Sequence, residues 1–238
     1  MPDSSLRPLM QGFTVMKKLL RHAVFPIKRR LIHAACERLK NRSAEQPLKW
    51  LDIAYLALAW GNLGYAAGFS YLRHVGEHSI RTQGPILECG SGATTLLIGA
   101  LTAKTDMRFI VLEHNREWYE YLKSLLAYLD FQHVELIHAP LTDYGDYRWY
   151  SSPLEPTPDE ISLVICDGPP GSIRGGRYGL LPIMGERLAS DCTILLDDTH
   201  RAAERRILDA WRQYRCMNAN RMGTLGSYTE VICCGSAL

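Results

Sequence analysis

Acidic residues stand at the ends of four short apolar runs in this chain. The runs end at Glu88, at Glu113, at Asp167 and at the pair Asp197 and Asp198. If the runs are parallel strands, their carboxyl ends meet at one edge of a sheet, and the carboxylates there line a common cleft. Carboxylates can accept hydrogen bonds from a ribose diol, ligate a hard divalent cation or take up a proton. The pattern therefore predicts a negatively charged binding site.

A glycine turn follows the first of these runs. Gly90 and Gly92 stand at alternate positions after Glu88, and a segment with helical propensity comes next. Glycine lets the backbone approach a ligand closely, and a helix N-terminus directs unpaired N–H groups at it. The order of strand, turn and helix predicts that Gly90, Ser91 and Gly92 bind a nucleotide-like ligand.

The turn departs from the pattern of a dinucleotide site. Such a turn reads Gly-x-Gly-x-x-Gly, whereas Thr95 stands at the third glycine position. The carboxylate of Glu88 would repel a pyrophosphate, but it would suit the cationic amino-acid end of a ligand. Glu113 lies 21 residues past Gly92 at the end of the second run, where an acid can bind a ribose diol. These departures disfavour a NAD-dependent oxidoreductase, which stays an alternative.

Strand-like and helix-like patterns alternate from residue 85 onward. Apolar residues recur at helical spacing in 115–128, where Asn115 is a plausible cap, and in 199–214, while 161–166 and 192–197 are continuous apolar runs. The alternation predicts an α/β fold, a Rossmann-like doubly wound and mostly parallel sheet. We expect strands over 85–89, 108–113, 134–138, 161–166, 192–197 and 228–234, and a weaker one near 213–218.

The first 80 residues are expected to form a helical N-terminal extension, and residues 81–238 the ligand-binding domain. Residues 1–50 carry eleven Lys and Arg against three acids, and helical apolar spacing runs through 14–42 with a break at Pro26. A basic amphipathic helix either packs on the core with a solvated basic face or contacts an anionic membrane or polymer. We favour packing on the core, and peripheral contact with a membrane is the alternative.

Composition limits the class of protein. The chain has 238 residues, 47% of them hydrophobic, which is enough for one full-sized core. It contains no apolar run of about 18 residues and no charged-then-apolar leader. Its seven cysteines are odd in number and lack a Cys-x-x-Cys pair. We therefore expect a reduced, cytoplasmic protein, with the inner membrane surface as an alternative place of contact.

The acidic-x-Gly-x-Gly pattern at Glu88, Gly90 and Gly92 resembles motif I of the class I S-adenosylmethionine-dependent methyltransferases. Glu113 matches the ribose-binding acid of that family, and Leu141 falls where its members contact adenine. The resemblance covers residues 81–238. It implies S-adenosylmethionine as cofactor, bound by Glu88, Gly90, Ser91, Gly92, Glu113, Leu141 and Asp167.

A narrower resemblance lies in the segments after the fourth and fifth strands. Asp167-Gly168-Pro169, then Gly176-Arg177, then Asp197-Asp198-x-x-Arg201-x-x-Glu204 are similar to methyltransferases that act on sugars, among them macrocin-type and glucuronoxylan-type enzymes. This resemblance implies O-methylation of a hydroxyl on a sugar or small molecule. The corresponding partner is a small-molecule or glycan acceptor.

Some members of the family hold Mg²⁺ with acids at these strand ends, and Asp167, Asp197 and Asp198 occupy matching places. Asp198 stands where the catechol enzymes usually have Asn, so a helix cap is its alternative role. Methyl transfer to a hydroxyl also needs a proton acceptor, for which His200 is the leading residue. The resemblance thus implies Mg²⁺ as a second cofactor, and we predict Asp167 and His200 as catalytic residues.

Two other classes of protein stay open besides a methyltransferase. One is the NAD-dependent oxidoreductase, and the other is a noncatalytic protein of the same fold that binds a membrane or polymer through residues 14–42. Nucleic acid is disfavoured as a partner because the ligand-binding domain is acidic. The aromatic and proline-rich segment 144–158 is expected to contact the acceptor or to fold down as a lid. The sequence indicates neither the acceptor nor an oligomeric state.

Overall fold

A computed structural model describes residues 26–43, 46–61, 68–151, 160–224 and 227–235. Its centre is a seven-stranded sheet in which the first five strands run parallel and β9 runs antiparallel to both of its neighbours. The strand order is β3 (Val134–His138), β2 (Phe109–Glu113), β1 (Ile86–Cys89), β6 (Ile161–Cys166), β7 (Leu188–Asp197), β9 (Tyr228–Cys233) and β8 (Met217–Met222). The expected Rossmann-like, mostly parallel α/β fold is confirmed.

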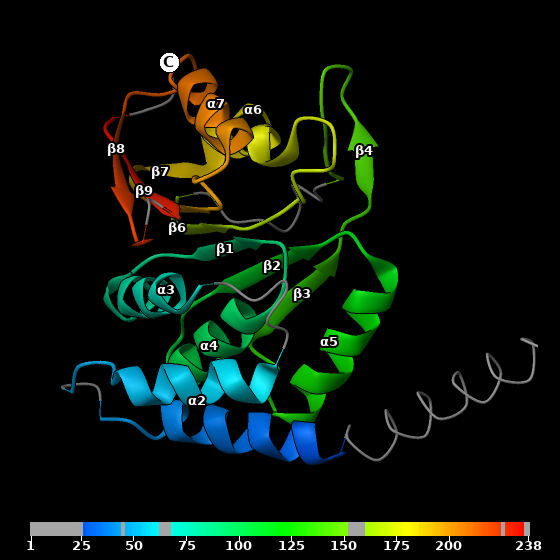
Figure 1. Cartoon of the computed structure of the whole chain (residues 1–238), viewed down its shortest axis with the longest axis vertical. Coiled ribbons are helices and arrows are strands. Elements are labelled where there is room, and N and C mark those ends of the chain that lie inside the picture. Colours follow the sequence, from blue (N-terminus) through cyan, green and yellow to red (C-terminus); the bar gives the residue numbers. More distant parts are fainter. Residues whose placement is uncertain (1–25, 44–45, 62–67, 152–159, 225–226, 236–238) are drawn as a thin grey trace, which may run out of the picture.

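Helices cover both faces of the sheet (Figure 1). One face carries helix 26–40, α2 (Trp50–Trp60), α3 (Phe69–Arg81), α4 (Ala93–Thr102) and α5 (Arg116–Tyr128). The other carries α6 (Leu180–Met184), α7 (Ala202–Trp211) and the turns η1 (Gly176–Gly179) and η2 (Gly185–Arg187). Because the central parallel strands are covered on both sides, β2 and β6 are almost continuous apolar runs.

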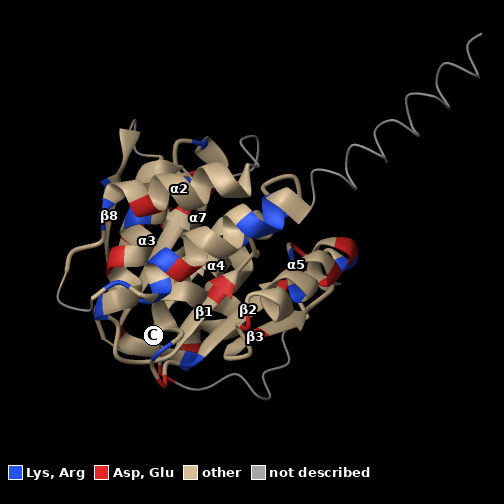
Figure 2. Ribbon diagram, turned by 90° about the horizontal axis from the view of Figure 1, so that it is seen from below, with Lys and Arg blue, Asp and Glu red and all other residues tan. Residues whose placement is uncertain are grey.

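The helical N-terminal region is part of the core on the face of the sheet where α3 contacts β6 and α2 packs on α3 and α4. Ile32 and Leu39 of helix 26–40, Leu56 of α2 and Val75 of α3 belong to the same buried cluster as Phe109 of β2. Basic residues of this region pair within the protein, as Arg38 does with Asp52 at 2.7 Å. Acidic and basic segments are interspersed on the helices of this face, α3 and α5 among them (Figure 2). The described part thus packs as a core-bound helix, while residues 14–25 lie outside the described ranges.

Two elements differ from the sequence-based expectation. The start of segment 144–158, for which no strand was expected, belongs to a hairpin of β4 (Leu141–Asp143) and β5 (Arg148–Tyr150), whose Trp149 and Tyr150 are fully buried. The hairpin forms because these two aromatic side chains cover the α6 face of the sheet. The strand expected at 213–218 starts later, since residues 212–214 continue as a turn after α7. Positions 152–159, with the expected proline cluster, lie outside the described residues.

Over the described ranges, every helix is too short or too polar to cross a lipid bilayer.

Candidate functional site

The strand order reverses between β1 and β6, and the backbone comes together closely at their carboxyl ends. Gly90 has a φ of +90°, and a Cβ there would lie 3.0 Å from both the Cα and the N of Gly168. Ligands of doubly wound sheets bind in the crevice at such a switch point. Gly90 is therefore required as glycine by both its conformation and its neighbour. Gly92 differs, because a Cβ there would point into open space.

Glu88 lies behind the glycine turn rather than in it. Its side chain is fully buried, and its two oxygens accept hydrogen bonds from the hydroxyls of Thr94 and Thr95, the latter at 2.7 Å. Burial raises the pKa of Glu88 to about 8, although the two threonine hydroxyls oppose the shift. Thr95 also accepts from the N–H of Gly92 at 2.9 Å. The predicted cofactor residue Glu88 thus shapes the turn from beneath.

Glu113 lies at the end of β2 beside the turn. One oxygen accepts from the hydroxyl and the N–H of Ser91 at 2.6 and 3.2 Å, and the other accepts from the N–H of Asn115 at 2.7 Å. Asn115 caps α5 as expected, accepting from the N–H of Trp118 at 3.0 Å. The structure therefore brings Glu113, Ser91 and the glycine turn together, as the sequence predicts.

Two polar atoms beside this crevice lack a hydrogen bond within the described residues. The hydroxyl of Tyr150 is buried without a partner, and a Cβ at Gly168 would collide with it. Burial raises the pKa of Tyr150, which keeps its hydroxyl a donor. The Nδ1 of His114 is likewise buried, and its ring lies 6.1 Å from the ring of Tyr150. Leu141 begins the hairpin that carries Tyr150 and is half-buried. Tyr150 belongs to segment 144–158, which the sequence predicts to contact the acceptor, and the structure buries its hydroxyl beside Gly168 at the crevice.

A buried guanidinium joins the acids at the ends of β6 and β7. Arg177, 2% exposed, places Nη2 2.8 Å from Asp167 Oδ1 and 2.8 Å from Asp198 Oδ2. Its Nη1 lies 2.8 Å from Oε1 of the buried Glu204. Asp198 has a φ of +63°, which aspartate tolerates. It does not cap α7, whose N-cap is Arg201, but accepts from the Arg201 side chain at 2.9 Å.

Asp167, Asp197 and Asp198 do not fit a Mg²⁺ site in this arrangement. Arg177 donates hydrogen bonds to one carboxylate oxygen each of Asp167 and Asp198. Asp197 Oδ1 accepts from the N–H of Asp198 at 2.8 Å. Within the described ranges these three carboxylates do not converge as a group of ligands. Octahedral coordination by oxygens would need them to converge. We therefore derive no step through Mg²⁺.

Two titratable side chains at the end of β7 could accept a proton. Asp197 is 9% exposed, and burial and then the charge of Asp167 raise its pKa to about 7. His200 is exposed two residues beyond Asp198, on the turn that leads to α7. A proton acceptor works best when its pKa lies near the working pH. Asp197 thus has a property that suits a base, although its sequence position suggested only a metal ligand.

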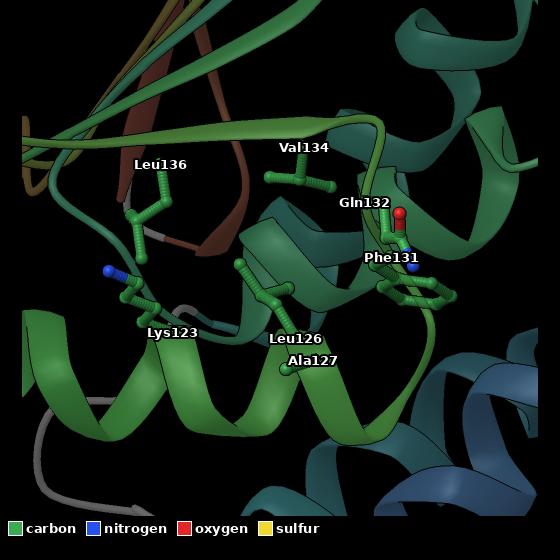
Figure 3. Close-up of a pocket in the computed structure, with 7 residues that line it drawn as sticks. All are labelled: Lys123, Leu126, Ala127, Phe131, Gln132, Val134 and Leu136. Atoms are coloured by element: carbon green, nitrogen blue, oxygen red, sulfur yellow. The ribbon is translucent and has the colours of Figure 1, made fainter.

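Two pockets in the described part of the chain differ in chemistry. One of about 220 Å³ lies between α5 and β3 and is lined mainly by apolar side chains such as Leu126 and Val134 (Figure 3). The other, of about 500 Å³, lies against α7 and η1. Its lining includes Tyr147, Tyr178 and Tyr214, with Glu204 and Arg206 from α7. The second pocket therefore adjoins the Arg177 cluster through Glu204.

Comparison with known proteins identifies the fold. No protein-family model matches the chain, and no curated protein matches it. The SAH-bound methyltransferase PaMTH1 of Podospora anserina is similar with a TM-score of 0.56 and 15% identity, covering 83% of this chain and 92% of that one. An O-methyltransferase of Bacillus cereus in complex with SAH has a TM-score of 0.50 and 11% identity, covering 77% and 88%. The chain has the Rossmann-like methyltransferase fold.

Proposed function

We propose that the protein is an S-adenosylmethionine-dependent methyltransferase that methylates a hydroxyl of a sugar or small molecule. The observation that carries the proposal is Glu113 at the end of β2, bonded to Ser91 of the glycine turn at the switch point of the sheet. The two solved structures of similar fold that bind SAH, the demethylated form of this cofactor, support the choice of ligand.

Residues of the crevice fit such a cofactor. Gly92 borders open space at the N-terminus of α4, where a ligand can approach the backbone, and Glu113 offers two acceptor oxygens for a ribose diol. The ribose hydroxyls would replace the Ser91 hydroxyl as donors to Glu113. The orphaned hydroxyl of Tyr150 provides a donor at the same edge. When bound, S-adenosylmethionine supplies an electrophilic methyl group on its sulfonium.

The protein's own groups then orient the acceptor and remove its proton. Arg177 fixes Asp167 at the end of β6, beside the switch point, and so fixes one wall of the crevice. The acceptor hydroxyl has to approach in line and lose its proton to a nearby base. We propose that Asp197 or His200 accepts the proton of the acceptor hydroxyl and that Asp167 is a positioning residue. Kinetics of Asp197→Asn and His200→Gln distinguish these two residues. The variant that lacks the base should have a much lower kcat, while its KM for the cofactor is unchanged.

The pocket against α7 is the proposed acceptor site. Its tyrosines give flat apolar faces, as sugar rings require, and Tyr178 and Tyr214 are joined by a hydrogen bond of 2.7 Å between their hydroxyls. Oε2 of Glu204 is buried without a hydrogen bond among the described residues, and Glu204 lines this pocket. A hydroxyl-rich acceptor would supply the missing donor. This arrangement favours a sugar over a purely apolar acceptor.

An acceptor screen tests this proposal. The protein is incubated with S-adenosylmethionine and a panel of sugars, glycosides and catechols, and formation of SAH is measured. We expect turnover with a polyhydroxylated acceptor and a raised KM for that acceptor in Tyr214→Ala, with cofactor affinity unchanged. Arg212→Ala, also near the end of α7 but outside the pocket lining, is the control. Turnover confined to catechols would contradict the assignment of a sugar.

Peripheral contact with a membrane stays a separate proposal. Trp50, Leu51 and Leu58 of α2 are 60, 54 and 73% exposed, and Ile27 of helix 26–40 is 59% exposed. Apolar side chains beside basic ones suit an anionic lipid surface. Sedimentation with anionic vesicles tests it, with residues 1–25 deleted in the comparison protein so that the buried side chains of helix 26–40, such as Ile32 and Leu39, stay in place. Equal sedimentation of both proteins would contradict contact through the deleted part of residues 14–42.

A further inference from the structure

Two histidines of α3 and a glutamate of β9 converge on the sheet face that the N-terminal helices cover. His78 Nε2 lies 2.9 Å and His74 Nε2 lies 3.4 Å from Oε1 of Glu230. Ligand atoms of all three lie within 4.8 Å of one another. In the described part of the chain, this is the one group of three such side chains that comes together.

We propose that His74, His78 and Glu230 bind a divalent transition-metal ion, with Zn²⁺ as the best match. Nitrogen and oxygen ligands at about 2.0–2.2 Å from a tetrahedral Zn²⁺ lie about 3.4 Å from each other. His74 and Glu230 have this spacing at 3.4 Å, whereas His78 at 2.9 Å lies about 0.5 Å closer to Glu230 than this geometry requires. Two imidazoles and a carboxylate suit Zn²⁺, and they leave a fourth position for water.

The backbone holds these ligands in place before any ion arrives. His74 and His78 are four residues apart on α3 and therefore share one face of the helix. The hydroxyl of Tyr71, on the same helix, donates to the carbonyl of Leu195 at 2.9 Å, which fixes α3 to β7. Leu195 is the partner of Glu230 in the pairing of β7 with β9. The three ligands thus come from elements joined by independent contacts.

A hydrogen bond between His78 and Glu230 does not account for the whole group. The Nε2 of His74 is buried and makes no hydrogen bond to the described residues. An unpaired buried nitrogen costs free energy, and a metal ion would remove that cost. The three side chains are 16, 21 and 15% exposed, so an ion and a water ligand can reach them. The bound ion would tie α3 to β9 and stabilise the fold.

Metal binding to the full chain tests the proposal directly. The protein is freed of metal with a chelator and dialysed, and it is then titrated with Zn²⁺ by calorimetry and with Co²⁺ by visible absorption. We expect one ion per chain, a tetrahedral Co²⁺ spectrum and a higher melting temperature with Zn²⁺. His74→Gln and Glu230→Gln should each weaken binding by more than about tenfold, since even partners outside the ligand set have effects of about 10–100-fold.

Two controls separate this site from other donors. His33→Gln changes an exposed histidine of helix 26–40, and a double replacement of the exposed Cys216 and Cys234 by serine removes the accessible thiols. Both controls should keep wild-type binding. Circular dichroism and the melting temperature without metal show whether His74→Gln and Glu230→Gln are folded. If folded His74→Gln binds as the wild type does, or if binding disappears in the cysteine variant, the proposal is wrong.

Discussion

The guanidinium of Arg177 holds Asp167 through two separate hydrogen bonds. Nη2 lies 2.8 Å from the carboxylate and 2.9 Å from the backbone carbonyl of the same residue. Because Asp167 follows β6 directly, this contact fixes the wall of the crevice at the switch point. A permanent cation in the protein thus does what a bound metal ion could have done, which is to neutralise acids at neighbouring strand ends.

Removing this cation should destabilise the protein. Arg177→Met leaves Asp167, Asp198 and Glu204 without their partner in a buried setting, and breaking a buried ion pair costs about 3–5 kcal/mol. Urea unfolding measures the change. Arg212→Met is the control, because Arg212 pairs with Asp209 on the surface and its loss should leave the midpoint nearly unchanged. Equal midpoints for both variants would contradict the role of Arg177.

We predict that Mg²⁺ does not bind to the carboxylates of Asp167 and Asp198. Arg177 already takes up Asp167 and Asp198, so titration with Mg²⁺ is expected to give no saturable heat, and affinity for S-adenosylmethionine is expected to be the same with and without Mg²⁺. Calorimetry measures both quantities. A saturable Mg²⁺ site that Asp167→Asn removes would restore the interpretation that the sequence first suggested.

The two glycines of the turn should respond differently to alanine. Gly90→Ala places a side chain at a φ of +90° and 3.0 Å from the Gly168 backbone, so we expect it to lower stability by at least about 1–2 kcal/mol. Gly92→Ala points into open space, so it should fold normally but weaken binding of the cofactor that we place there. Urea unfolding and calorimetry with SAH distinguish these effects. Unchanged SAH affinity in Gly92→Ala would contradict the placement of the ligand.

Stability should fall as the pH rises, because of Glu88. Its pKa is about 8 in the folded chain against an ordinary value of 4.5, so the folded state binds more protons between these values. The unfolding free energy therefore decreases from about pH 4.5 to about pH 8, by on the order of a few kcal/mol. Glu88→Gln should flatten this dependence in urea titrations, whereas Glu117→Gln, at an exposed position, should not. Equal slopes for wild type and Glu88→Gln would contradict the assignment.

The sequence predicted most of the sheet and the position of the crevice. Continuous apolar runs such as 161–166 and the spacing of Gly90, Gly92 and Glu113 depend on local pattern, and the structure has the strand and the turn where they were expected. The hairpin of β4 and β5 could not be predicted this way, because it forms through the burial of Trp149 and Tyr150 against distant strands. Its two strands are three residues long, too short for an alternation of apolar and polar residues to distinguish them from a loop.

Side-chain partners were the harder part of the site. In the sequence, Arg177 stands out only as part of the Gly176-Arg177 pair, yet three acids from separate elements bind it, and only the fold brings them together. The role of Glu88 likewise depends on hydrogen bonds from Thr94 and Thr95, which stand in the first turn of α4, after the glycine turn. The histidine pair of α3 did have a local signal, the spacing of four residues, but Glu230 lies far away in sequence.

Calorimetric titration of the purified protein with S-adenosylmethionine, SAH and NAD tests the central claim most directly. We predict that the first two bind and NAD does not. Because hydrogen bonds to a charged group are worth about 1.5–3 kcal/mol, Glu113→Gln should bind about ten to one hundred times more weakly. Glu117→Gln should bind as the wild type does. Binding of NAD without binding of S-adenosylmethionine or SAH would contradict the account, and so would a folded Glu113→Gln with unchanged affinity.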